Sequence, residues 1–155
     1  MTHGGRDHEP EEVEPLLGAL LRMPYQAMMT DAVEPELIAA GYDDIRTAHL
    51  PVLQALTRHS GGLRATELAA NSRITKQSMG YLVDHLEAHG YVERVADPDD
   101  GRAKVVRLTP RGWEVIQVIR DAFRRVEDDW GRRIGAVRVE QLRGILHGLV
   151  VSLDR

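Results

Sequence analysis

The side chains best suited to recognise another molecule gather in residues 75–90. The apolar residues of this stretch recur with helical spacing and form one stripe, which consists of Met79, Leu82, Val83 and Leu86. On the other side, the first turns offer hydrogen-bonding groups: Thr75, Lys76, Gln77, Ser78 and Tyr81. A helix that presents such groups outward while a core holds its stripe is suited to enter a groove. The stretch predicts a DNA recognition helix, with Thr75 as its N-cap and Gly90 as the turn that ends it.

The same stretch contains two histidines, His85 and His89, at the i, i+4 spacing of two metal ligands on a helix. The glutamate of a His-Glu-x-x-His peptidase is missing and the chain has no cysteine, although Asp84 and Glu87 are close. Surface or capping roles explain these histidines better, so we expect no metal. The sequence also contains no Gly-rich phosphate loop and no nucleophile elbow. We therefore expect no catalytic residues, no cofactor and no enzymatic activity.

The composition indicates one compact, mainly helical domain. Of the 155 residues, 43% are hydrophobic but only 5% are aromatic, which favours aliphatic packing of helices. The absence of cysteine excludes disulfides and thiolate zinc sites and fits a reducing compartment. No apolar run has the length of a membrane span, and the acidic N-terminus lacks a signal-peptide pattern. We expect a cytoplasmic protein without a membrane partner.

The net charge of −4 is unevenly distributed along the chain. Residues 1–60 carry a net charge of −6, whereas residues 61–112 and 113–155 carry +1 each. The acidity therefore lies away from the predicted recognition helix. Because positive and negative charges nearly cancel in residues 61–112, attraction to phosphate must depend on a few well-placed cations.

The N-terminal region combines helical periodicity with two interruptions. Apolar residues recur at helical spacing from residue 13 to about residue 40, but Pro24 and Pro35 lie within this range. A kinked or broken helix is therefore expected. Its residues Met23, Met28 and Met29 either line an adaptable pocket or belong to ordinary core or dimer packing. Tyr25 is expected beside Met28 and Met29 as a further contact for a small ligand. The polar residues 1–12 before it predict a disordered tail.

The central part of the chain contains the signals of a helix-turn-helix. A helix is expected from Thr47 to Arg58, followed by a short helix that Thr66 caps. Residues 71–74 then form a turn into the recognition helix. Two helices joined by so short a turn, the second with a polar outer face, are typical of this DNA-binding motif.

A β-hairpin is predicted directly after the recognition helix. Residues 91–95 and 103–108 are short, β-branched and partly alternating, which is typical of strands. The turn formers of residues 97–102 lie between them. Placed after a helix-turn-helix, this hairpin occupies the position of the wing in a winged helix.

Further apolar helices flank the winged helix at both ends. One is predicted to begin at Thr109-Pro110 and to reach about Trp130, and another contains the apolar residues from Leu142 to Leu153. A second copy of the chain is the simplest partner for these stripes, and a homodimer also supplies a second DNA half-site. The expected organisation is a tail (1–12), an N-terminal dimerisation region (13–46), a winged helix-turn-helix (47–108) and C-terminal dimerisation helices (109–155).

Three short motifs in order resemble those of the MarR (multiple antibiotic resistance regulator) family. They are Gly90-Tyr91-Val92-Glu93-Arg94, Asp100-Gly101-Arg102-Ala103-Lys104 and Leu108-Thr109-Pro110-Arg111-Gly112, and the second fits the family's Asp-x-Arg-x-Lys wing signature. The resemblance runs from about Leu16 to Leu153. It implies a mainly α homodimer with a two-stranded wing. It also implies binding to a pseudo-palindromic operator, usually as a repressor that a small aromatic or phenolic effector releases.

The resemblance also implies roles for single residues. Arg102 is expected to enter the minor groove, where a narrow A·T-rich groove concentrates negative potential, and Lys104 is expected to contact phosphate. Asp100 is expected to brace the wing by pairing with a nearby arginine such as Arg94. His49 either binds an effector carboxylate or phenol or satisfies a backbone carbonyl at the dimer interface.

On the recognition helix, we expect Lys76, Gln77 and Tyr81 to contact base edges or flanking phosphates. Thr75 and Ser78 are expected on the DNA backbone. The alternative is a winged helix that has lost DNA binding and works as a protein-interaction module. Retention of Arg102 and Lys104 argues against that alternative, because a wing without DNA needs neither cation.

Overall fold

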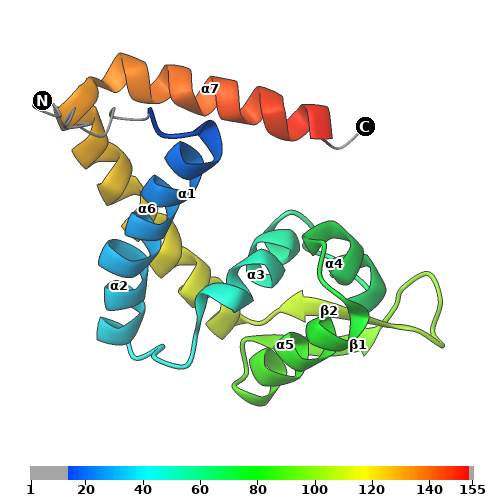
Figure 1. The fold of residues 1–155 in the computed structure, drawn as a ribbon. Coiled ribbons are helices and arrows are strands. Elements are labelled where there is room, and N and C mark those ends of the chain that lie inside the picture. Colours follow the sequence, from blue (N-terminus) through cyan, green and yellow to red (C-terminus); the bar gives the residue numbers. More distant parts are fainter. Residues whose placement is uncertain (1–13, 154–155) are drawn as a thin grey trace, which may run out of the picture.

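The computed structural model describes residues 14–153. The predicted disordered tail, residues 1–12, lies outside the described residues. Helices dominate, and a single hairpin completes the described fold (Figure 1). This confirms the predicted mainly α winged helix. The elements are α1 (Leu17–Met28), a π-helical turn η1 (Met29–Val33), α2 (Glu34–Ala39), a 3-10 turn η2 (Thr47–His49), α3 (Leu50–Thr57), α4 (Ala65–Ser72), α5 (Lys76–Ala88), β1 (Val92–Ala96), β2 (Lys104–Leu108), α6 (Pro110–Ile134) and α7 (Ala136–Leu153).

The N-terminal helix is irregular but continuous from α1 through η1 to α2. Pro24 lies inside α1 and Pro35 lies in the first turn of α2. The π-helical turn falls between the two prolines, and there the Glu34 N–H donates to the carbonyl of Met29, five residues earlier. A widened turn of this kind absorbs an irregularity without ending the helix. The helix is therefore not broken, and its distortion lies in η1.

The predicted apolar stripe holds the recognition helix α5 in place. Met79, Val83 and Leu86 are fully buried and Leu82 is half-buried. Thr75 is the N-cap as predicted, since its Oγ1 accepts a hydrogen bond from the Ser78 N–H at 3.2 Å.

The end of α5 agrees with its prediction, whereas the start of α4 does not. Gly90 follows α5 with φ +75°, as its terminating role requires. The prediction that Thr66 caps α4 is wrong, because the helix begins at Ala65, two residues before the start that this cap would give. Arg64 is its N-cap, and the Glu67 carboxylate accepts the Arg64 N–H at 2.7 Å.

The wing is a regular antiparallel hairpin in which Val92 pairs with Leu108 and Ala96 with Lys104. A bridge to Leu63 adds a third short segment: the Leu63 N–H donates to the Val106 carbonyl at 3.0 Å, and the Val106 N–H donates back at 2.8 Å. The loop before α4 is thereby tied to the hairpin, so the wing has a fixed base.

Helix α6 connects the winged helix to the terminal helices (Figure 1). Thr109 caps it as predicted, accepting the Gly112 N–H at 3.1 Å. The helix continues past the predicted end near Trp130 to Ile134, because the first strong stop is Gly135 with φ +98°. No residue of α1 or α7 is buried in the single chain. Within residues 14–153, no helix has the length and apolar character that crossing a bilayer requires.

Gly112→Ala should destabilise the fold, because a Cβ at this position would overlap the Tyr91 carbonyl oxygen and lie 3.0 Å from Leu108 Cδ2. We expect chemical denaturation to show a loss of about 1–3 kcal/mol in the free energy of unfolding. The matched control is Gly80→Ala in α5, where nothing lies within 4 Å of the added carbon. That change should raise stability by up to about 1 kcal/mol. Equal effects of the two substitutions would contradict the close approach of α6 to Tyr91.

Candidate nucleic-acid interface

The polar face of α5 is exposed along its first two turns. All five predicted contact residues, Thr75, Lys76, Gln77, Ser78 and Tyr81, are exposed. The Thr75 hydroxyl also bonds the Ser78 hydroxyl at 2.9 Å, so these two side chains are occupied with capping the helix. In residues 14–153, no hydrogen bond or ion pair engages the side chains of Lys76, Gln77 or Tyr81. Tyr81 is 68% exposed. These three are free to reach an external partner.

Two exposed cations of the wing stand out because they have no acidic partner within residues 14–153. Arg102 and Lys104 lie at and beside the tip of the hairpin, and neither side chain forms an ion pair within the described part of the chain. The Arg102 N–H donates to Asp100 Oδ1 at 3.1 Å, which shapes the turn rather than occupying the guanidinium. By contrast, Arg107 of β2 pairs with Glu93 of β1 at 2.7 Å. The wing therefore leaves two positive charges at its outer end without an internal partner.

The arginine beside Asp100 is Arg64, at 3.9 Å, and not Arg94, which the sequence suggested as an example. Arg94 Nη2 lies 2.6 Å from Asp84 Oδ1, and its Nη1 contacts Glu87. Arg94 occupies the middle of β1, opposite Val106, and faces the C-terminal half of α5, whereas Asp100 lies in the turn beyond the strand ends. Arg94 thus joins the hairpin to the recognition helix instead of bracing the tip.

Arg64, which the sequence analysis missed, braces the wing. Its Nη2 lies 2.6 Å from Asp97 Oδ2, and its Nε donates to the same oxygen at 2.7 Å. Asp100 lies farther from this guanidinium, at 3.9 Å. The Asp97 side chain is nearly buried and also accepts the Asp99 N–H at 2.9 Å. The N-terminus of α4 is thereby joined to the base of the turn that carries Arg102.

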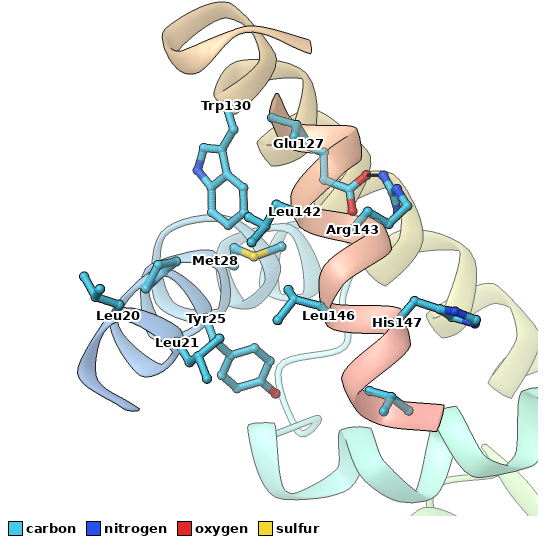
Figure 2. A pocket seen from close by; sticks show the side chains of 13 residues that line it. Leu20, Leu21, Tyr25, Met28, Glu127, Trp130, Leu142, Arg143, Leu146 and His147 are labelled. Carbon is cyan, nitrogen blue, oxygen red and sulfur yellow. Dashed lines mark hydrogen bonds and ion pairs between the residues drawn. The ribbon is translucent and has the colours of Figure 1, made fainter. Parts of the chain in front are cut away.

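The residues predicted for an effector do not form one site. Tyr25 and Met28 line an apolar groove of about 590 Å³ between α1, the end of α6 and α7 (Figure 2). Trp130 and Leu142 face them across it. Met29 is instead buried in the core.

His49 lies apart from this groove and is also buried. Its Nδ1 accepts the Arg46 N–H at 2.9 Å, and its ring stacks on His85 with centroids 4.5 Å apart. Burial and the neighbouring His85 lower the pKa of His49 to about 4. Within residues 14–153 the ring accepts a backbone N–H rather than donating to a carbonyl, so the two roles considered for this residue stay predictions.

Arg64→Gln should raise the pKa of Asp97. That pKa lies below the ordinary 3.8 because the Asp99 N–H and then Arg64 favour the carboxylate. The stabilisation from this carboxylate is present above about pH 3.8 and is lost as the pH falls through the lowered pKa. NMR titration of the side-chain carboxyl carbon should show the pKa move toward 3.8 in the variant, though not fully, because the Asp99 N–H remains. Arg107→Gln, which removes the partner of Glu93, should leave the pKa of Asp97 unchanged. An unchanged pKa in Arg64→Gln would contradict the brace.

Comparison with known proteins identifies relatives over most of this architecture. A sequence model of the MarR family matches residues 43–103. The transcriptional activatory protein BadR of Rhodopseudomonas palustris is 28% identical over 127 residues, which cover 81% of this chain and 67% of BadR. Two further curated regulators match over 60% and 55% of their own lengths. The chain therefore spans between about half and two thirds of these relatives.

Solved structures agree with the fold. A crystal structure of MarR is 25% identical, covers 99% of this chain and 97% of its own, and superposes with a TM-score of 0.76. A point mutant of Staphylococcus aureus MepR, bound to an oligodeoxyribonucleotide, is 23% identical and has a TM-score of 0.60 over 90% of this chain and 99% of its own. The matching family model, the related regulators and the shared winged helix support a winged-helix transcriptional regulator of the MarR type, a family whose members are not enzymes.

Proposed function

We propose that this regulator binds a pseudo-palindromic DNA operator as a homodimer. The observation that carries the proposal is a set of exposed side chains without internal partners on two neighbouring elements. They are Lys76, Gln77 and Tyr81 on α5, with Arg102 and Lys104 on the wing. Both elements lie at the end of the molecule far from α7 (Figure 1). The structure of MepR with bound DNA supports this assignment for a protein of the same fold.

The two elements suit different parts of DNA. An α-helix fits the major groove, where the amide of Gln77 can bond adenine at two positions, and Lys76 can bond guanine or phosphate. The narrower minor groove attracts a guanidinium, which is the role of Arg102 at the tip of the wing. Lys104 then lies beside the groove and binds phosphate. Thr75 and Ser78 lie at the exposed N-terminus of α5, and the Ser78 hydroxyl hydrogen, which neither capping bond uses, can donate to a phosphate.

The homodimer is supported by a large exposed apolar surface on α1 and α7. Their exposed residues include Leu17, Leu20, Leu21, Val137, Leu142, Ile145, Leu149 and Val150. Soluble monomers rarely expose a continuous apolar surface of this kind. A second copy that packs its own α1 and α7 against this face covers it by two-fold symmetry. The groove that Tyr25 and Met28 line belongs to the same face (Figure 2).

Repression and release by a small aromatic effector stay predictions. The name of BadR describes that relative as an activatory protein, and the sign of regulation depends on where an operator lies relative to a promoter. Tyr25 and Met28 are the predicted effector residues that line a groove, whose volume is of the size that binds small ligands. An effector there would compete or cooperate with the packing of the second copy.

The alternative function is a protein-interaction module without DNA binding. The unpaired cations of the wing favour DNA as the partner, because a wing that does not bind a polyanion has no need of two unpaired positive charges. Selection of bound duplexes from a random DNA pool at two salt concentrations separates the alternatives. A dimeric reader should enrich an inverted repeat with half-sites about one helical turn apart. Negligible binding at low salt would favour the interaction module.

Arg102→Ala should weaken binding to the selected operator by about 10- to 100-fold, because the minor-groove guanidinium is lost. Fluorescence anisotropy over a range of salt concentrations should also show a shallower dependence of log K on log salt, by about one unit. Arg124→Ala is the matched control, since Arg124 is 68% exposed on α6, away from the wing. Unchanged operator affinity in Arg102→Ala would remove the wing from the recognition of DNA.

Ile145→Glu should convert the dimer to a monomer, because it places a carboxylate in the apolar face of α7. Ile145 is 64% exposed in the single chain, so the substitution should leave the protomer folded. Light scattering after size-exclusion chromatography measures the mass, and operator affinity should fall with the loss of the second half-site. Gln141→Glu adds the same charge to an exposed polar position of α7. If the Ile145→Glu protein is still a dimer, the dimer interface does not include this face of α7.

A further inference from the structure

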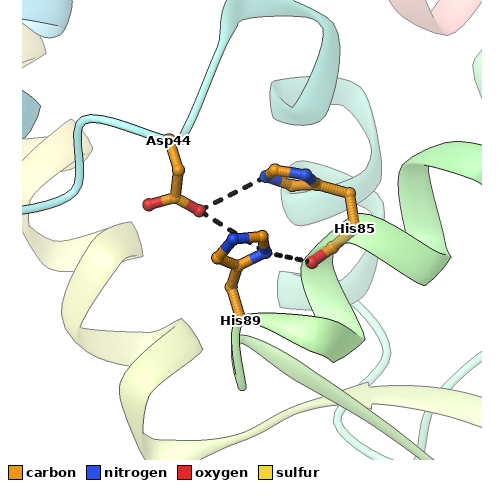
Figure 3. A group of neighbouring side chains, drawn as sticks. All are labelled: Asp44, His85 and His89. Carbon is orange, nitrogen blue, oxygen red and sulfur yellow. Dashed lines mark hydrogen bonds and ion pairs between the residues drawn. The ribbon is translucent and has the colours of Figure 1, made fainter.

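Two histidines of the recognition helix meet an aspartate from a distant segment. His85 and His89 lie in the last turn of α5 and at its C-cap. Asp44 belongs to the segment 40–46, which joins α2 to η2. One ligand atom from each of the three residues lies within 4.8 Å of the other two. Figure 3 shows the three side chains converging.

We propose that Asp44, His85 and His89 bind a divalent transition-metal ion of the zinc class. Two imidazoles and a carboxylate are ligands that Zn²⁺ and its neighbours prefer, whereas Mg²⁺ and Ca²⁺ prefer sites made of oxygen. Three protein ligands leave one tetrahedral position for water. The i, i+4 spacing on α5 supplies two of the ligands from one helix face.

The distances are close to those that a bound ion needs. Asp44 Oδ2 lies 3.3 Å from His85 Nε2 and 3.9 Å from His89 Nδ1. Ligand atoms around a tetrahedral zinc lie about 3.4 Å apart, given metal–ligand bonds near 2.1 Å. His89 Nδ1 also lies 2.8 Å from the His85 carbonyl oxygen. Because the His89 side chain is 46% exposed, its ring can turn to present a nitrogen to the ion.

Two ligand atoms are buried without a hydrogen-bond partner in the described part of the chain. They are Asp44 Oδ2 and His85 Nε2, which face each other without hydrogen-bond geometry. A buried polar atom left unsatisfied is costly. An ion between the two atoms would coordinate both, and the titration described below separates a metal site from the His85–Asp44 ion pair that the 3.3 Å distance also allows.

The surroundings supply the outer contacts that metal ligands normally have. Tyr91 Oη donates to Asp44 Oδ1 at 2.7 Å, which orients the carboxylate and leaves Oδ2 for the ion. His49 stacks on the His85 ring with an interplanar angle of 13° and fixes its direction. The other two acids near these histidines, Asp84 and Glu87, are engaged with Arg94 and lie outside the cluster. Asp44 is therefore the carboxylate ligand.

A bound ion would join the segment 40–46 to the end of the recognition helix. This segment is also attached to α6, because Tyr42 Oη donates to Glu114 at 3.0 Å. The ion would therefore add a link between the helix that reads DNA and the connection leading to α1 and α2.

The test is a calorimetric titration of the full, untagged and metal-stripped chain with Zn²⁺. Wild-type protein should bind one ion per protomer with micromolar or tighter affinity, and Mg²⁺ should give no binding. Asp44→Asn and His89→Gln should each weaken Zn²⁺ binding by at least about 100-fold, because each removes a ligand. His59→Gln is the control, since His59 is exposed on the loop after α3 and should bind as wild type does.

The visible spectrum of the Co²⁺-loaded wild type provides a readout that does not depend on any variant. Intense d–d bands of a tetrahedral ion should appear at one equivalent and disappear when Zn²⁺ is added. Absence of these bands, or Zn²⁺ affinity that survives both ligand substitutions, would overturn the proposal. The titrations contain no DNA, so failure of the metal site is distinguishable from failure of the operator proposal.

Discussion

The burial of one side of α5 is the constraint on which the rest of this structure depends. Met79, Val83 and Leu86 are fully buried, and each contributes about 1.5–3 kcal/mol by leaving water. Since consecutive residues of a helix point about 100° apart, the same packing dictates where the opposite face points. Rotation of α5 by one residue would bury polar groups and expose the stripe. Lys76 and Gln77 therefore point out of the molecule because the opposite face of α5 is buried in the core, and not because of any contact that these two side chains make.

The distribution of ion pairs decides which cations remain available to a polyanion. With a net charge of −4, this chain cannot attract DNA by charge alone. Arg64, Arg94 and Arg107 all have acidic partners close by, and the pair that is exposed on both sides, Arg107 with Glu93, adds little stability. Their effect is positional, because they fix the hairpin to α4, to α5 and across its own strands. Arg102 and Lys104 remain unpaired, within the described part of the chain, at the outer end of a wing that is held at its base.

Much of the fold could be predicted from features that depend only on residues close together in the sequence, such as helix caps and turns. The caps at Thr75 and Thr109, the turn at Gly90 and the hairpin depend on local geometry, and the structure confirms them. Contacts between distant residues could not be predicted, because no local rule states which side chains tertiary packing brings together. Arg64 and Asp97 lie 33 positions apart, and this pair replaces the expected one between Asp100 and Arg94. The family motif indicated that the wing needs an acid and an arginine there, but not which ones.

The segment 40–46 contacts both the winged helix and the helices that flank it. On one side it continues into α2, which Arg125 of α6 holds through Glu36 at 3.0 Å. On the other it contacts the end of α5 through Asp44 and the start of α6 through Tyr42. A ligand shifts the separation of two recognition helices only if it prefers one arrangement over the other. A ligand in the groove beside α1 would act through the packing of two protomers. An ion bound by Asp44, His85 and His89 would act within one protomer, at the recognition helix itself. Because this short segment joins α2 to the end of α5 and the start of α6, its contacts determine how firmly the winged helix is held to α2 and α6.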